Sequence, residues 1–117
     1  MQPIDTKNAL HAKLLARLLE HLEDSSTVLL TKSAERDMSV LVLSEPVTKI
    51  GLLECMQRFI DEGKTLFLER QDFGVDAFVF RFIRVEDIDV FVKAHFGKSE
   101  PPKLLIIFAA HPDRIWS

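Results

Sequence analysis

The side chains in this sequence that could carry out chemistry include four histidines and one cysteine. The histidines are His11, His21, His95 and His111. No two of them have the i, i+4 spacing that puts two zinc ligands on one helix face, and a single cysteine cannot complete a sulfur site. Cys55 lies in the middle of a predicted helix, where a cysteine typically packs as a small hydrophobic residue. We therefore expect no metal site, and a structural role for the cysteine.

Charged residues surround a hairpin that the sequence predicts over residues 64–83. Glu69 and Asp76 flank its tip, and Arg70 and Arg81 lie on its strands. General acid–base catalysis needs carboxylates that converge in a cleft, whereas the charges at a hairpin tip usually face solvent. The catalytic residues, if there are any, therefore stay unknown. The residues that we expect to contact a ligand or a partner are Arg70, Arg81, Phe78 and Phe80.

Two tripeptides in the chain also occur in known families. Asp72-Phe73-Gly74 matches the magnesium-binding tripeptide of protein kinases. His111-Pro112-Asp113 matches the tripeptide that J-domain co-chaperones carry in a loop between two helices. The kinase tripeptide acts with a Gly-rich loop, a strand lysine and a catalytic aspartate, and this sequence has none of these companions. We interpret both tripeptides as turns, since glycine and proline are typical of strand ends and hairpins. With no phosphate loop or dinucleotide fingerprint either, we expect no cofactor.

The composition is that of a globular protein without a basic footprint. Of its 117 residues 47% are hydrophobic and 28% charged, and the net charge of -3 argues against nonspecific nucleic-acid binding. The longest apolar run, 104–110, is far shorter than the ~20 residues that span a membrane. One cysteine permits no internal disulfide, and no leader pattern opens the chain. We expect a single domain over residues 1–117, in the cytoplasm, with no nucleic-acid or membrane partner.

Hydrophobic spacing predicts an α+β fold. Apolar residues three and four apart predict helices at 8–23, 46–62 and 85–96, the second beginning at Ser44-Glu45-Pro46 and ending at Gly63. Runs of aliphatic and aromatic residues predict strands at 27–32, 38–43, 64–70, 75–83 and 103–110. The first four strands are expected to form two hairpins. The predicted order is α-β-β-α-β-β-α-β, with a mixed or antiparallel sheet.

This order has two resemblances among known folds. Over residues 38–110 it resembles the ferredoxin-like β-α-β-β-α-β arrangement, to which a helix and a strand are added at the N-terminus. The succession of α-β-β and α-β-β-α segments is similar to that of type III secretion chaperones, although the last strand departs from their pattern. The second resemblance implies a small, acidic, dimeric protein that binds other proteins.

The strand at 75–83 is apolar on both of its faces, which indicates burial on both. Its two faces carry Phe78, Phe80 and Phe82 on one side, and Ala77, Val79 and Ile83 on the other. We expect helices 46–62 and 85–96 to cover the first face. The second face needs helix 8–23, a ligand or a second copy of the chain. We favour the second copy, because a helix about 24 Å long cannot shield five strands.

These patterns leave two functions open. The leading hypothesis is a non-enzymatic, homodimeric binding domain, either a sensor of a small ligand or an accessory that binds a protein. The alternative is a small enzyme with a pocket between the sheet and its helices, whose reaction the sequence does not identify. A deep pocket with converging polar side chains favours the enzyme, and a filled one favours the binding domain.

Overall fold

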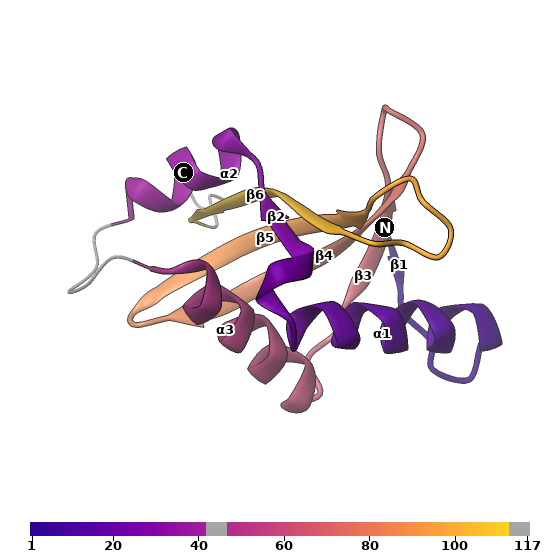
Figure 1. The fold of residues 1–117 in the computed structure, drawn as a ribbon. Helices are drawn as coiled ribbons and strands as arrows, with labels where there is room; N and C mark the ends of the chain where they lie inside the picture. The colour runs from indigo at the N-terminus through magenta and orange to yellow at the C-terminus, as the bar shows by residue number, and fades with distance from the viewer. Residues whose placement is uncertain (42–46, 113–117) are drawn as a thin grey trace.

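A computed structural model describes residues 1–41 and 47–112, and these form a mixed sheet with three α-helices (Figure 1). The helices are α1 (Ala9–Leu22), α2 (Lys32–Ser39) and α3 (Lys49–Asp61), with a 3-10 turn at Ser25–Thr27. The strands are β1 (Gln2–Pro3), β2 (Val28–Leu30), β3 (Phe67–Arg70), β4 (Asp76–Val85), β5 (Ile88–Phe96) and β6 (Leu105–Pro112). The predicted α+β class is confirmed.

The six strands lie in the order β1-β3-β4-β5-β6-β2. Strands β3 to β6 form an antiparallel meander, and β1 extends it at one edge by pairing with β3. At the other edge β2 pairs in parallel with β6. Between β2 and β3 the chain therefore passes from one edge of the sheet to the region of the opposite edge, and α2 and α3 lie in this connection.

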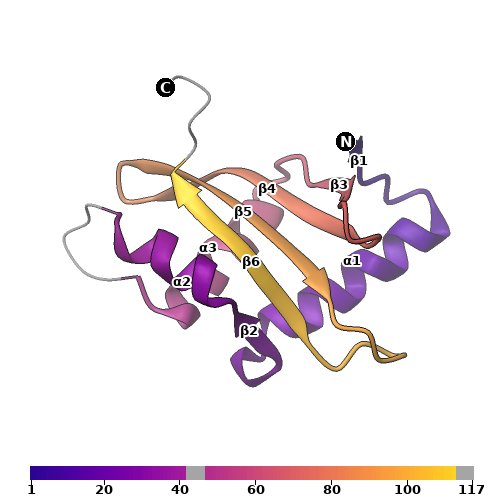
Figure 2. The same cartoon turned by 90° about the horizontal axis from the view of Figure 1, so that it is seen from above.

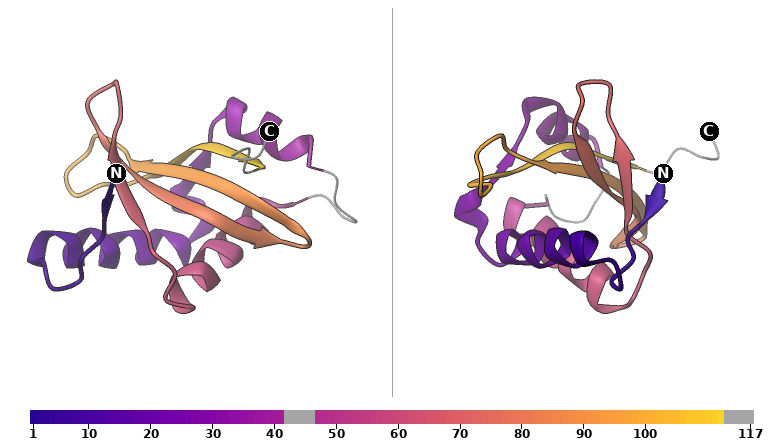
Figure 3. Two further views of the ribbon diagram at one scale, coloured as in Figure 1. Left: turned by 180° about the vertical axis from the view of Figure 1, so that it is seen from behind. Right: turned by 90° about the vertical axis from the view of Figure 1, so that its right-hand side faces the viewer.

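Helices α1 and α3 lie together on one face of the sheet (Figures 1 and 3). The ring of Phe59 in α3 meets Phe80 of β4 at 5.4 Å, and His21 in α1 meets Phe96 of β5 at 5.8 Å, both between ring centroids. Phe78 and Phe80 are almost completely buried beneath these helices. Helix α3 thus covers Phe80, as predicted for one of its two expected cover helices, whereas α1 lies on this same face and not on the opposite one.

The ends of α1 and α3 follow from local capping. The side chain of Asn8 accepts hydrogen bonds from the backbone N–H groups of Leu10 and His11, which satisfies two donors of the first turn. Thr48 does the same for the N–H of Gly51 at the start of α3. The predicted start at Ser44-Glu45-Pro46 lies outside the described residues. Gly63, with φ of 73°, takes the left-handed conformation that ends a helix.

The helix predicted at 85–96 is wrong, because these residues form β5. Val90, Val92 and Ala94 are buried and alternate with half-buried residues, which is the period of a strand and not of a helix. The acidic residues that suggested a helix start form a tight turn instead, in which Glu86 has φ of 52° and Val85 pairs with Ile88. The ferredoxin-like order is therefore not confirmed, and the element order that resembled the secretion chaperones is not the observed one.

The first predicted hairpin is also wrong, because 32–39 is a helix where a polar loop was expected. Thr31 caps this helix by accepting from the N–H of Ala34, and Ala34 and Met38, four residues apart, are buried on one side. The polar residues between them form its exposed face. Helix α2 packs beside β6, where the short β2 ends (Figure 2). Part of the predicted strand at 38–43 lies outside the described residues.

A β-bulge in β4 changes which side chains face the helices. The pairing with β5 shifts register between Phe80 and Ile83, so that Ile83 joins Phe80 in the core although strict alternation places them on opposite faces. Ile83 was predicted to lie beside Val79. Val79 stays on the other face, where Phe67 of β3 and Lys93 of β5 are its cross-strand neighbours.

Candidate functional site

One face of the sheet is free of helices over β3, β4 and β5 within the part of the chain that the structure describes. Seen from this side, the strands lie in front of α1 and α3 (Figure 2). The tip of the β3–β4 hairpin and helix α2 both rise on this side, at opposite ends (Figures 1 and 3). We call this surface the open face. Together with the neighbouring β6 it carries Glu69, Phe73, Phe91, Lys93, His95, Phe108 and His111.

Three rings on the open face form one cluster. Phe73, from the hairpin tip, lies 5.4 Å from His95 and 5.8 Å from Phe108, and the last two are 5.2 Å apart, between centroids. The side chains come from a turn and from two neighbouring strands, so the hairpin folds back onto the sheet to make the cluster. Phe73 is nevertheless 59% exposed. An aromatic residue this exposed is typical of a contact surface and not of a core.

A second ring pair lies further along the same two strands. Phe91 and His111 are directly opposite each other in β5 and β6 and stack with 5.3 Å between centroids and 21° between planes. In both histidines of the open face, His95 and His111, Nδ1 is 2.9 Å from a backbone carbonyl oxygen. A carbonyl only accepts, so Nδ1 carries the proton and Nε2 is left as the acceptor of a neutral ring.

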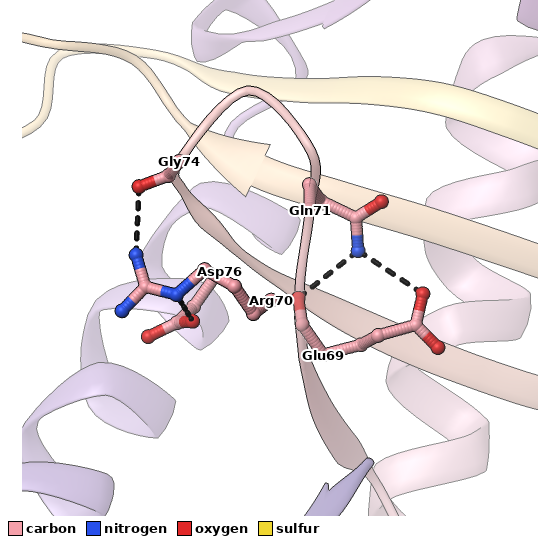
Figure 4. Close-up of polar contacts among 5 residues, drawn as sticks. All are labelled: Glu69, Arg70, Gln71, Gly74 and Asp76. Carbon is pink, nitrogen blue, oxygen red and sulfur yellow. Dashed lines mark hydrogen bonds and ion pairs between the residues drawn. The ribbon is translucent and has the colours of Figure 1, made fainter.

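An ion pair joins the outer strands of the open face. Lys93 of β5 contacts the carboxylate of Glu69 in β3, and its ammonium lies 5.5 Å from the Phe91 ring centroid. Gln71 donates to the same carboxylate at 3.2 Å (Figure 4). These hydrogen bonds, that of Lys93 above all, lower the pKa of Glu69 against the opposing effect of its burial. The face therefore holds its lysine and glutamate as a neutralised pair.

Replacing Glu69 by glutamine is expected to cost about 1 kcal/mol at pH 7, because the pair is only partly exposed. The pKa of Glu69 is lowered on folding, so its contribution is complete above the ordinary value of 4.5 and disappears as the pH falls through the folded value. Urea unfolding at pH 7 and at pH 3 measures this, and the difference between E69Q and the natural chain should shrink at pH 3. A difference that grows on acidification contradicts it.

The variant Glu62→Gln is the matched control for that measurement. Glu62 also pairs with a lysine, Lys64, but at 3.6 Å and with both side chains more than 40% exposed. Solvent screens such a pair, and we expect its removal to change the free energy of unfolding by a few tenths of a kcal/mol at either pH.

The residues predicted as ligand or partner contacts do not come together. Phe78 and Phe80 lie in the core under α1 and α3, and Arg81 is half-buried at the bulge of β4. Arg70 points away from Glu69, and its guanidinium pairs with Asp76 at 3.1 Å and donates to the carbonyl of Gly74 at 2.7 Å (Figure 4). Their role in binding stays a prediction.

Sequence reasoning missed the ring cluster of the open face. Phe73 was interpreted only as part of a turn, and His95 was assigned to a helix. Counted in steps of two, Phe91, Lys93 and His95 fall on one side of a strand, and this was the signal that could have found them.

Cys55 has the structural character that its position in a helix predicts. It is half-buried in α3, beside a cavity of about 330 Å³ that Arg58 and Arg84 also line. Burial raises the pKa of its thiol more than the charge of Arg58 lowers it, so the thiolate that acts as a nucleophile is disfavoured.

Metal sites and membrane spans are two further features to consider among the described residues. Within residues 1–41 and 47–112 no three histidine, cysteine or acidic side chains lie close enough to hold a metal ion. None of the three helices is both long and apolar enough to cross a membrane. Comparison with known proteins gives no further lead, since no family model, no curated protein and no solved structure matches this chain.

Proposed function

We propose that this protein is a non-enzymatic interaction domain of the cytoplasm that forms a homodimer through the open face. The observation that carries the proposal is the cluster of Phe73, His95 and Phe108 on a sheet face without a helix. Apolar aromatic surface is costly to leave in water, and antiparallel sheets usually keep their uncovered face polar. A partner that covers these rings removes that cost.

The charges of the open face favour a second copy over a polyanion. Lys93 of the open face is paired with Glu69. Binding to phosphate groups needs cations that are available to neutralise them. A surface whose cations already have carboxylate partners can approach a copy of itself without net repulsion. Two-fold symmetry also makes such a self-complementary contact the commonest kind of oligomer interface.

The size of the open face suits a modest interface. Strands β4, β5 and β6, about 4.8 Å apart and roughly 30 Å long, together with the four-residue β3 give a projected area of roughly 500 Å². The hairpin tip and α2 add surface at its ends. Standard interfaces bury ~800 Å² per partner, so we expect a dimer of moderate affinity.

The enzyme alternative receives no comparable support. It required a deep pocket between the sheet and the helices, and the space between β4, α3 and the second half of α1 is filled by a continuous core. The core between them includes Leu18, Leu52, Met56, Phe59, Phe78 and Phe80.

Isotope-filtered NMR tests the interface itself. In a mixture of labelled and unlabelled chains, we expect intermolecular contacts from the ring protons of Phe73 and Phe108 to residues of the open face in the other copy. Intermolecular contacts found only on α1 and α3, or none at high micromolar concentration, contradict the proposal.

A further inference from the structure

We propose that a cavity at the β1 edge of the sheet binds a small, uncharged molecule that has an acceptor oxygen on an apolar body. The cavity measures about 440 Å³ and lies where β1, α1 and the β3–β4 hairpin meet. Its size is within the ~300–1,000 Å³ of small-molecule sites. Its lining is Met1, Gln2, Leu10, His11, Leu14, Leu68, Arg70 and Asp76. This site is separate from the open face and does not depend on dimerisation.

His11 supplies the hydrogen-bond donor. Its side chain is only 5% exposed, and its Nδ1 accepts from the backbone N–H of Asp5 at 3.0 Å. An accepting Nδ1 carries no proton, so the ring proton of the neutral side chain is on Nε2. Among the described residues Nε2–H has no hydrogen-bond partner. A buried donor without a partner is costly, and an acceptor oxygen in the cavity that His11 lines removes that cost.

The charges of the lining favour an uncharged ligand. Arg70 and Asp76 are the charged side chains among the lining residues, and they pair with each other across the hairpin (Figure 4). A ligand carboxylate meets Asp76 as a like charge, and a ligand ammonium meets Arg70 in the same way. An amide or ketone oxygen avoids both repulsions and still accepts from His11.

The remaining wall is apolar and partly exposed. Leu14 and Leu68 belong to the packed side of α1 and β3, whereas Leu10 is 63% exposed at the start of α1. An alkyl chain against these leucines removes apolar surface from water, which supplies most of the binding free energy of such small ligands.

Hexanamide is the probe that tests this site, with hexylammonium chloride as the probe that lacks the acceptor. We expect hexanamide to bind with a dissociation constant of about 1–10 mM, in the range of small fragments. Binding is followed by the ¹⁵N shift of His11 Nε2 in long-range heteronuclear spectra and by backbone shifts. Hexylammonium should bind at least about tenfold more weakly, since an ammonium cannot accept a hydrogen bond. Equal binding of the two probes, or an unmoved Nε2 at saturation, overturns the proposal.

Variants separate a specific site from general apolar binding. His11→Phe removes the donor and should weaken the binding of hexanamide at least about tenfold. His21→Phe changes a second buried histidine of the same helix, which does not line the cavity, and should leave the affinity for hexanamide unchanged. If His11→Phe does not fold, the exposed Leu10→Gln serves instead, with an expected threefold loss. Its control is Ile50→Gln on α3, also exposed. If a variant and its control lose the same affinity for hexanamide, the proposed site is contradicted.

Discussion

Replacing Phe80 by alanine lowers the free energy of unfolding by about 3–5 kcal/mol. Phe80 is completely buried in β4, and its ring contacts Phe59 of α3. The sheet and the helix cannot collapse into the space without moving each other, so the variant loses both the transfer free energy and the contacts around the cavity. Urea unfolding at one fixed protein concentration measures the difference.

The control for this measurement is Ile50→Ala. Ile50 is an aliphatic residue of α3 that is 58% exposed, and its truncation should cost less than about 1 kcal/mol. If the two variants lose the same free energy, α3 does not pack on β4 as described.

Replacing Phe73 by glutamate weakens self-association about 100-fold. Phe73 is exposed at the hairpin tip and joins the ring cluster of His95 and Phe108, so its loss removes apolar surface from the proposed interface. A two-fold contact also brings two copies of each substitution into the same interface, where buried glutamates lack partners. A 100-fold change corresponds to about 2.7 kcal/mol.

The matched control for Phe73→Glu is Ile50→Glu. It places the same charge at an equally exposed apolar position, on a helix of the opposite side of the sheet. We expect its dissociation constant to equal that of the natural chain. Equal weakening by both variants indicates a general effect of charge and contradicts the role of the open face.

The elements with unambiguous periodicity and caps could be predicted from the sequence. The leucines of α1 follow a helical spacing after Asn8, and Gly74, with φ of 83°, marks the hairpin between β3 and β4. For these elements the local preference and the final packing agree, so the sequence alone is sufficient.

In the two segments that were predicted wrongly, packing and not local preference determines the secondary structure. In 88–96 apolar residues occur both at alternate positions and three or four apart, and the pairing with β4 and β6 selects the strand. In α2 only Ala34 and Met38 are buried, so the helix depends on its cap at Thr31 and on β6. Pairings between distant segments cannot be read from spacing within one segment.

The candidate site was hidden for the same reason. Phe73, His95 and Phe108 are far apart in the sequence, and only the observed strand register brings them together. The bulge at Phe80 further changed which residues of β4 face the helices. We expected the second sheet face to need a cover of its own, and α1, one of the candidates for that cover, lies on the other face.

Sedimentation equilibrium of the natural chain and of Phe73→Glu, from low to high micromolar concentration, tests the central claim most directly. We predict that the natural chain approaches twice its monomer mass of 13.4 kDa, while Phe73→Glu stays near the monomer mass over the same range. A natural chain that remains monomeric at high micromolar concentration, or a Phe73→Glu variant that dimerises equally well, contradicts it.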